Sequence, residues 1–312
     1  MRDDGSPDEE AVSPRPLLKW AGGKGKLIPE FCQRLPAGLP EGRIGRFIEP
    51  FVGGGAFYFH LAHRYPSLQC HLFDINEELI LLYTVLQQDV EVLIQELQER
   101  ASAYSSSDED ERPELFYQVR SRFNASKPRI DYQTYSVDWI ERAADLIFLN
   151  RTCFNGLFRV NSRGEFDVPF GKYKNPAILS EGILRADAAL LRKATLHHGD
   201  FTASGADITE GSFVYFDPPY RPLNASSLFT GYAKDGFSDK DQISLAEFFR
   251  ECDAKGAFCM LSNSDPTHHD PDDSFFDDLY EGFTIERVLA SRIINSDATR
   301  RGKIHEIIVR NY

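Results

Sequence analysis

The chain has 312 residues, of which 42% are hydrophobic and 12% aromatic, so it can bury a large core and lacks the composition of a disordered protein. No apolar run approaches the roughly 20 residues of a membrane span, and the acidic N-terminus lacks the apolar region of a signal peptide. The five cysteines form no C-x-x-C pair, which favours reduced thiols in the cytosol over disulfides or a zinc site.

The formal net charge of −13 argues at first against a nucleic-acid partner, but this charge is unevenly distributed. Residues 1–12 and 108–114 each sum to −4, and residues 265–281 sum to −7. The rest of the chain therefore carries +2, so the net charge does not rule out a surface that binds nucleic acid.

Residues 1–15 are predicted to form a disordered acidic tail, because they show no hydrophobic periodicity. A glycine-rich turn follows at residues 21–25 and leads into a helix. The turn superficially resembles a phosphate-binding loop, but Leu27 stands where that loop has a Ser or Thr for magnesium. The pattern therefore argues against a nucleoside triphosphatase.

A predicted strand at residues 47–49 leads to a run of three glycines, residues 53–55, and then to a helix. Glycines at the end of a parallel strand let the backbone approach a ligand closely. Asp74 ends a second strand about 20 residues later, where an acid suits the ribose hydroxyls of an adenosine-containing cofactor. Because Tyr58 replaces the third glycine of the dinucleotide-binding pattern, a purely structural turn explains the stretch about equally well.

Residues 77–149 are predicted to be mostly helical, and they are too many for an ordinary crossover between strands. Strand patterns resume after residue 195. The alternation of strands and helices predicts an α/β fold, with a parallel sheet covered by helices on both faces and the helical segment inserted into it. Helices are expected at residues 77–88, 90–103, 114–124 and 137–150, and the later strands at 195–198, 212–217, 257–262, 283–289 and 304–310.

Within the insertion, two runs of alternating residues flank a four-residue turn that ends at Gly164. The pattern predicts a β-hairpin on which Phe158 and Val160 share a face, opposite Leu157 and Arg159. The hairpin region is basic, and a basic two-stranded ribbon fits the major groove of duplex DNA. A solvated charged hairpin is the competing interpretation, and the position beside a cofactor-type core favours DNA modestly.

The rest of the chain is organised around residues 213–220, where four apolar residues end in Asp217, two prolines and Tyr220. The run predicts a short buried strand that stops abruptly. The Asp217 carboxylate and the Pro218 carbonyl, held still by the prolines, suit the two hydrogens of an amine on a planar ring, on which Tyr220 can stack. The competing interpretation is a strand-end turn with a surface tyrosine.

Five blocks of the chain together resemble the Dam-type DNA adenine methyltransferases, including the GATC-modifying enzymes of DpnII-type restriction systems. The resemblance covers about residues 16–312 and implies a Rossmann-like S-adenosylmethionine-dependent methyltransferase sheet with an inserted, mainly helical DNA-recognition domain. It also implies S-adenosylmethionine as the methyl donor and a flipped adenine amine in duplex DNA, within GATC, as the acceptor. The blocks are residues 18–24, 49–55, 74–76, 150–176 and 217–220.

The resemblance implies roles for individual residues as well. Phe154 stands where an intercalating tyrosine is more familiar, and Lys172 replaces an arginine, which changes the contact available there. The expected catalytic residues are Asp217, Pro218 and Tyr220. The expected cofactor-binding residues are Trp20, Lys24, Gly53, Gly55, Asp74 and Asp217, and the expected DNA-binding residues are Lys19, Phe154, Asn155, Leu157, Arg159, Pro169 and Tyr173.

The expected organisation is a tail at residues 1–15, a catalytic domain at 16–76 and 179–312, and a target-recognition domain at 77–178. Duplex DNA is the expected partner, no metal is expected, and a cytosolic monomer is the default. The alternatives are a DNA-binding module of the same fold without activity, and a methyltransferase acting on RNA or protein. A nicotinamide-dependent dehydrogenase would use the glycine turn and Asp74 but gives no reason for Asp-Pro-Pro-Tyr.

Overall fold

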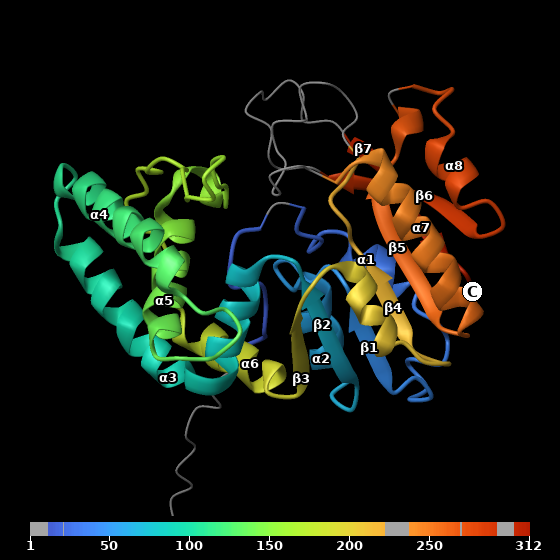
Figure 1. Cartoon of the computed structure of the whole chain (residues 1–312), viewed down its shortest axis with the longest axis horizontal. Helices are drawn as coiled ribbons and strands as arrows, with labels where there is room; N and C mark the ends of the chain where they lie inside the picture. The colour runs from blue at the N-terminus through green and yellow to red at the C-terminus, as the bar shows by residue number, and fades with distance from the viewer. Residues whose placement is uncertain (1–11, 21, 222–236, 269, 292–302) are drawn as a thin grey trace, which may run out of the picture.

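The computed structural model describes residues 12–20, 22–221, 237–268, 270–291 and 303–312, and the strands among them form one seven-stranded sheet (Figure 1). The strand order is β3-β2-β1-β4-β5-β7-β6. The strands are β1 Arg46–Glu49, β2 Gln69–Asp74, β3 Ala194–His198, β4 Phe213–Phe216, β5 Phe258–Ser264, β6 Thr284–Ser291 and β7 Lys303–Arg310.

The first five strands of that order are parallel, as the alternation of strands and helices predicted, whereas β7 is antiparallel to both of its neighbours. The expectation of a wholly parallel sheet is therefore wrong for β7, which alone among these strands runs in the opposite direction. A parallel connection needs a crossover of about a dozen residues or more, usually a helix. The short stretch between Ser291 and Lys303 favours antiparallel pairing instead.

Strand β4 lies at the centre of the sheet, and all four of its side chains are fully buried. Phe213 and Tyr215 belong to the core that contains helices α1, α2 and α6, while Val214 and Phe216 belong to the core under α7 and α8. This confirms the predicted buried strand with helices on both faces. The helices are α1 Ile28–Cys32, α2 Ala56–Arg64, α6 Glu181–Leu191, α7 Asp239–Ala254 and α8 Phe275–Leu279, with 3₁₀ turns η3 Phe201–Ala206 and η5 Pro266–His268.

The inserted segment consists of three long helices, α3 Glu77–Ser106, α4 Glu111–Ser126 and α5 Asp138–Thr152, with a 3₁₀ turn, η1 Lys127–Arg129, between the last two. In Figure 1 they stand beside the β3 edge of the sheet, and α3 packs on α5, α6 and β3. The predicted break between the helices at residues 77–88 and 90–103 is confirmed as a kink in α3 at Asp89, whose φ and ψ are −135° and 42°. No helix among the described residues is long and apolar enough to cross a membrane.

The predicted hairpin of the insertion is less regular than expected. Its two runs are joined by isolated antiparallel bridges, Cys153 to Phe170 and Val160 to Phe166, rather than by a continuous ladder. A 3₁₀ turn, η2 Phe154–Gly156, interrupts the first run. The turn at its tip forms as predicted, with Gly164 at a φ of +77°. The segment is therefore a looped ribbon instead of a flat two-stranded sheet.

Most of the predicted acidic tail, residues 1–11, lies outside the described residues. The end of that predicted tail, residues 12–15, is described, and the backbone N–H of Arg15 donates a hydrogen bond to Asp187 Oδ1 of α6 at 3.0 Å, so residue 15 is not part of a disordered tail.

Candidate active site

Segments that are far apart in the sequence meet at the carboxyl ends of β1, β2 and β4. These strands are adjacent and parallel, so the residues that follow them lie along one edge of the sheet. Gly53 follows β1, Asp74 ends β2 and Asp217 follows β4. Lys24 of the N-terminal glycine-rich turn reaches the same edge, where its Nζ lies 2.8 Å from Asp217 Oδ1.

Asp74 holds the glycine turn of β1. The backbone N–H groups of Gly53 and Asn76 each donate to one of its carboxylate oxygens at 2.8 Å, and Tyr83 OH donates to the Gly53 carbonyl at 2.6 Å. Burial raises the pKa of Asp74 to about 6, and these backbone N–H groups limit the increase. Each carboxylate oxygen has a second lone pair, so Asp74 can still accept a hydrogen bond from a ligand hydroxyl.

The glycines of this turn are required by aromatic rings that pack against it. Gly53 has a φ of +49°, and a Cβ there would lie 3.2 Å from the Trp20 ring. Gly55 has a φ of +73°, and its Cβ would lie 2.9 Å from the Phe59 ring. Trp20 also stacks on Phe158 of the insertion, with ring centroids 5.3 Å apart. The turn therefore contacts both the sheet and the insertion.

Lys24 lies between Asp217 and Tyr220 and contacts both side chains. The Lys24 ammonium is buried, donates to the Gly22 carbonyl at 2.6 Å, and lies 4.1 Å from the centroid of the Tyr220 ring. Ser262 Oγ donates to Asp217 Oδ1 at 3.2 Å. Burial raises the pKa of Asp217 to about 6, and Lys24 limits this increase. Asp217 is therefore ionised at neutral pH, with a cation between it and the aromatic ring.

The side chain of Tyr220 is fixed at its far end, because its hydroxyl donates a hydrogen bond to Glu306 Oε2 on β7. Pro218 is buried and Pro219 is exposed. Burial and the nearby Glu306 carboxylate raise the pKa of Tyr220 well above its ordinary value, so the phenol stays neutral. The structure thus places the three predicted catalytic residues in one short turn, and it adds Glu306, which no local motif indicated.

Glu49 is a further buried acid at this edge, to which the sequence analysis assigned no role. Its side chain is 2% exposed, and its Oε2 has no hydrogen-bond partner among the described residues. Burial raises the pKa of Glu49 well above its ordinary value, and Asp217 adds to the effect. The position of Glu49 directly before the glycine-turn motif was the available signal.

Two of the residues predicted to contact DNA, Lys19 and Tyr173, lie together beside this edge, with Lys19 Nζ 4.7 Å from the Tyr173 ring centroid. The buried amide of Asn150 accepts from Lys19 N and donates to the carbonyls of Lys19 and Gly156, each at 2.9 Å. It therefore joins the N-terminal turn to the ribbon of the insertion. Leu157, the next residue along the ribbon, is half-buried.

The remaining residues of that set lie along the ribbon. Phe154 is 51% exposed, and its backbone N–H donates to the carbonyl of the exposed Pro169 at 2.8 Å. Asn155 is exposed and has a φ of +56°, a left-handed conformation that asparagine tolerates. The exposed Arg159 donates to Asp167 Oδ1 at 2.7 Å. A DNA contact by Arg159 would therefore compete with this carboxylate.

Comparison with known proteins gives a consistent result over nearly the whole chain. Residues 20–294 match the family described as D12 class N6 adenine-specific DNA methyltransferase. The chain is 46% identical to the type II methyltransferase M.MjaIII of Methanocaldococcus jannaschii, over 96% of this chain and 99% of that protein. It is 36% identical to the type II methyltransferase M1.LlaDCHI of Lactococcus lactis, over 96% of each chain. It is 33% identical to a DNA adenine methylase of Vibrio cholerae, over 94% of this chain and 95% of that one.

Proposed function

The chain belongs to the D12 class of N6 adenine-specific DNA methyltransferases, and we propose that Asp217, Pro218 and Tyr220 hold the target adenine outside the duplex. The enzyme transfers a methyl group from S-adenosylmethionine to adenine in DNA. The proposal depends on one observation: the Asp217 carboxylate and the Tyr220 ring both contact the Lys24 ammonium. Lys24 Nζ lies 2.8 Å from Asp217 Oδ1 and 4.1 Å from the centroid of the Tyr220 ring.

The residues at this edge fit S-adenosylmethionine, which supplies an electrophilic methyl group on a positively charged sulfur. The carboxylate of Asp74 can accept from the ribose hydroxyls, and the bare backbone at Gly53 and Gly55 allows close approach. The unpartnered Oε2 of Glu49 lies at the same edge and suits a cationic ligand. We assign the donor to these residues together with Trp20, Lys24 and Asp217.

An adenine inside a duplex cannot present its amine to this buried edge, so the base must be flipped out. Tyr220 stacks on the flipped base, a contact worth about 1–3 kcal/mol. Asp217 and the Pro218 carbonyl accept the two amine hydrogens, which directs the nitrogen lone pair away from the ring. Positioning and electrostatics supply most of the acceleration. The methylated nitrogen is then acidic enough to lose its proton without a strong base.

In this proposal the Lys24 ammonium occupies the position of the adenine amine when no substrate is bound. It contacts the same carboxylate oxygen and the same aromatic face that the adenine would use. Entry of the base therefore requires Lys24 to move aside, and until then Lys24 keeps Asp217 ionised.

We propose that residues 77–178 recognise the target sequence, within GATC, and that residues 16–76 and 179–312 form the catalytic part. Support comes from the exposure of Phe154, Asn155 and Arg159 on one ribbon, and from the contact of Lys19 with Tyr173 beside the active site. All five cysteines are free thiols, which suits the reducing cytosol. We propose further that the enzyme acts as a monomer and needs no metal.

The deciding experiment measures methyl transfer to duplexes that contain GATC or a single-base variant of it. We expect transfer to the GATC duplex, and a loss of at least about 10²–10³-fold in turnover for Asp217→Ala. The variant should still fold, although the loss of the partner of Lys24 lowers its stability, and the other residues assigned to the donor should still bind it. Wild-type turnover by Asp217→Ala would show that the assigned role is wrong, and equal transfer to all duplexes would exclude GATC specificity.

A further inference from the structure

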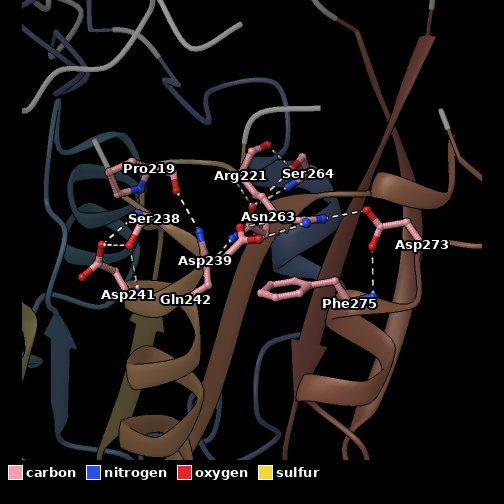
Figure 2. Close-up of polar contacts among 10 residues, drawn as sticks. All are labelled: Pro219, Arg221, Ser238, Asp239, Asp241, Gln242, Asn263, Ser264, Asp273 and Phe275. Carbon is pink, nitrogen blue, oxygen red and sulfur yellow. Dashed lines mark hydrogen bonds and ion pairs between the residues drawn. The ribbon is translucent and has the colours of Figure 1, made fainter. Parts of the chain in front are cut away.

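The two peptide groups that flank Tyr220 are held by a pair of buried side-chain amides (Figure 2). Gln242 Nε2 donates to the carbonyl of Pro219 at 3.1 Å, and Asn263 Nδ2 donates to Gln242 Oε1 at 3.1 Å. The backbone N–H of Arg221 donates to Asn263 Oδ1 at 3.3 Å. Both amide side chains are completely buried. Gln242 and Asn263, hereafter the amide relay, thus bind the backbone on both sides of the Tyr220 ring.

Only one orientation of these amides satisfies every partner. The Pro219 carbonyl can only accept, so Gln242 must point its NH₂ group toward it and its oxygen toward Asn263. Asn263 must then donate with its NH₂ group, and its oxygen accepts from the N–H groups of Arg221 and Ser264. Reversing either amide would place two acceptors or two donors together in a buried site, which is costly.

The amide relay is anchored in elements that are themselves well fixed. Gln242 lies in the first turn of α7, where Ser238 caps the helix and its backbone N–H donates to Asp241 at 2.8 Å, as Figure 2 shows. Asn263 lies near the end of β5, next to β4. The turn therefore takes its position from an α-helix and a neighbouring strand.

The side chain of Arg221 adds a second attachment at the end of the same turn. Its guanidinium bonds Asp239 Oδ1 at 2.8 Å and Asp273 Oδ2 at 2.7 Å, and it lies 4.3 Å from the centroid of the Phe275 ring. These contacts tie the residue after Tyr220 to α7 and to the segment that leads into α8. They also give a role to part of the acidic run at residues 265–281.

We propose that the amide relay is a positioning device for methyl transfer, in which Gln242 and Asn263 set the placement of the Tyr220 ring and of the acceptors before it. The inference rests on the proposed roles of Asp217, Pro218 and Tyr220. Neither amide touches the adenine or the donor. Both act through the backbone of the turn, where a displacement of about 1 Å can lower the rate by about a hundredfold.

The first test compares Gln242→Leu with the matched control Gln87→Leu. Gln87 also donates through Nε2 to backbone carbonyls, those of Leu191 and Ala194, but it lies in α3 away from Tyr220. We expect Gln242→Leu to lower kcat by about tenfold or more, with nearly unchanged affinities for S-adenosylmethionine and duplex DNA. Gln87→Leu should keep the wild-type kcat, even if both variants lose similar thermal stability.

The second test uses Gln242→Glu and a pH profile, which a purely structural role would not alter. When protonated, the introduced carboxyl can donate to the Pro219 carbonyl as the amide does, and when ionised it cannot. The wild-type rate should rise with pH as Asp217 ionises around its pKa of about 6. The rate of Gln242→Glu should fall again at higher pH, as the carboxyl loses its proton, which gives a bell-shaped profile.

The outcomes separate this proposal from the one on which it rests. If Asp217→Ala is inactive while Gln242→Leu keeps the wild-type kcat, the amide relay has no positioning role. Should Gln242→Leu fail to fold, the Gln242→Glu profile decides, and a profile parallel to the wild type would overturn the proposal. Full activity of Asp217→Ala would instead contradict the proposed catalytic site itself.

Discussion

Buried carboxylates occur both in the helical insertion and at the catalytic edge of the sheet, but the two regions neutralise them differently. In the insertion, Glu78 is bound by the buried Arg142, and Asp145 is bound by Arg100 and Arg122. Tyr132 OH also donates to Glu78 at 2.6 Å. Each of these acids is matched by a guanidinium that joins one helix to another.

The acids of the catalytic edge have weaker or movable partners. Asp74 accepts from the backbone N–H groups of Gly53 and Asn76, and Glu49 Oε2 has no partner among the described residues. Asp217 is paired with Lys24, a flexible side chain that also contacts Tyr220. Accordingly, burial raises the pKa of each of these three carboxyls.

The partners of the buried acids indicate that the helical insertion is a scaffold and that the catalytic edge of the sheet is a binding site. A buried ion pair with matched hydrogen bonds fixes the packing of helices, and removing one partner leaves an uncompensated charge. Carboxylates that lack a permanent cation leave negative potential for a ligand, here a sulfonium and an amine. Raised pKa values are typical of such sites, although burial alone can also produce them.

The largest expected loss of stability comes from breaking the scaffold. Arg142→Met removes the partner of Glu78, and we expect the free energy of unfolding to fall by about 3–5 kcal/mol. Urea denaturation measures this loss. Replacing both residues by Met should recover most of the stability, because no charge is then left buried. A small effect of Arg142→Met alone would contradict the assignment of this pair as a scaffold.

An exposed ion pair of the insertion should behave as a recognition contact instead. Arg159 pairs with Asp167 on the surface, so Arg159→Ala should leave the unfolding temperature nearly unchanged. We expect it to cost about 1–3 kcal/mol of discrimination at one base pair of the target. Methylation of duplexes with single-base changes measures this loss, with Arg163→Ala as the control on the same ribbon. Equal weakening for all duplexes would mark Arg159 as a phosphate contact.

Removal of the movable cation tests the catalytic edge. Because Lys24 lowers the pKa of Asp217, Lys24→Met should raise that pKa above about 6. Methyl transfer requires ionised Asp217, so the increase of the rate with pH should shift to higher pH in this variant. At pH 7 we expect a loss of up to about tenfold, which recovers in more alkaline buffer. An unshifted pH profile at the same protein stability would contradict the role given to Lys24.

Asp187 separates burial from function, because it is a buried acid outside both regions. Its Oδ1 accepts from Arg15 N, its Oδ2 has no partner among the described residues, and burial raises its pKa to about 8. The folded state therefore holds a proton that the unfolded state loses, and stability falls as pH rises from about 4 to 8. The free energy of unfolding should depend less steeply on pH in Asp187→Asn, by up to about 1.4 kcal/mol per pH unit, and turnover should not change. Urea denaturation across that range measures it, and an unchanged slope would contradict the burial argument.

Local patterns in the sequence were sufficient to predict most of the helices and strands, and the functional residues that lie at the ends of the strands. The buried run of β4, the glycine turn after β1 and Asp74 at the end of β2 were all predicted, because strands, prolines and glycines have preferences that act over a few residues. The resemblance to the family, which the comparisons confirm, rests on the same short blocks. Regular pairing in the ribbon was predicted wrongly, since the left-handed Asn155 interrupts it.

The amino-acid sequence by itself therefore determined the α/β class, the buried strand that ends in Asp-Pro-Pro-Tyr and the family to which the chain is similar. Only the tertiary structure decided what surrounds that turn. Asn150 binds Lys19 across 131 positions, Glu306 binds Tyr220 across 86, and Gln242 binds Pro219 across 23. Glu306 and Gln242 lie in none of the blocks that carry the resemblance, and the block that contains Asn150 does not indicate its partner. These contacts are selected by the packing of distant elements, which no local preference encodes.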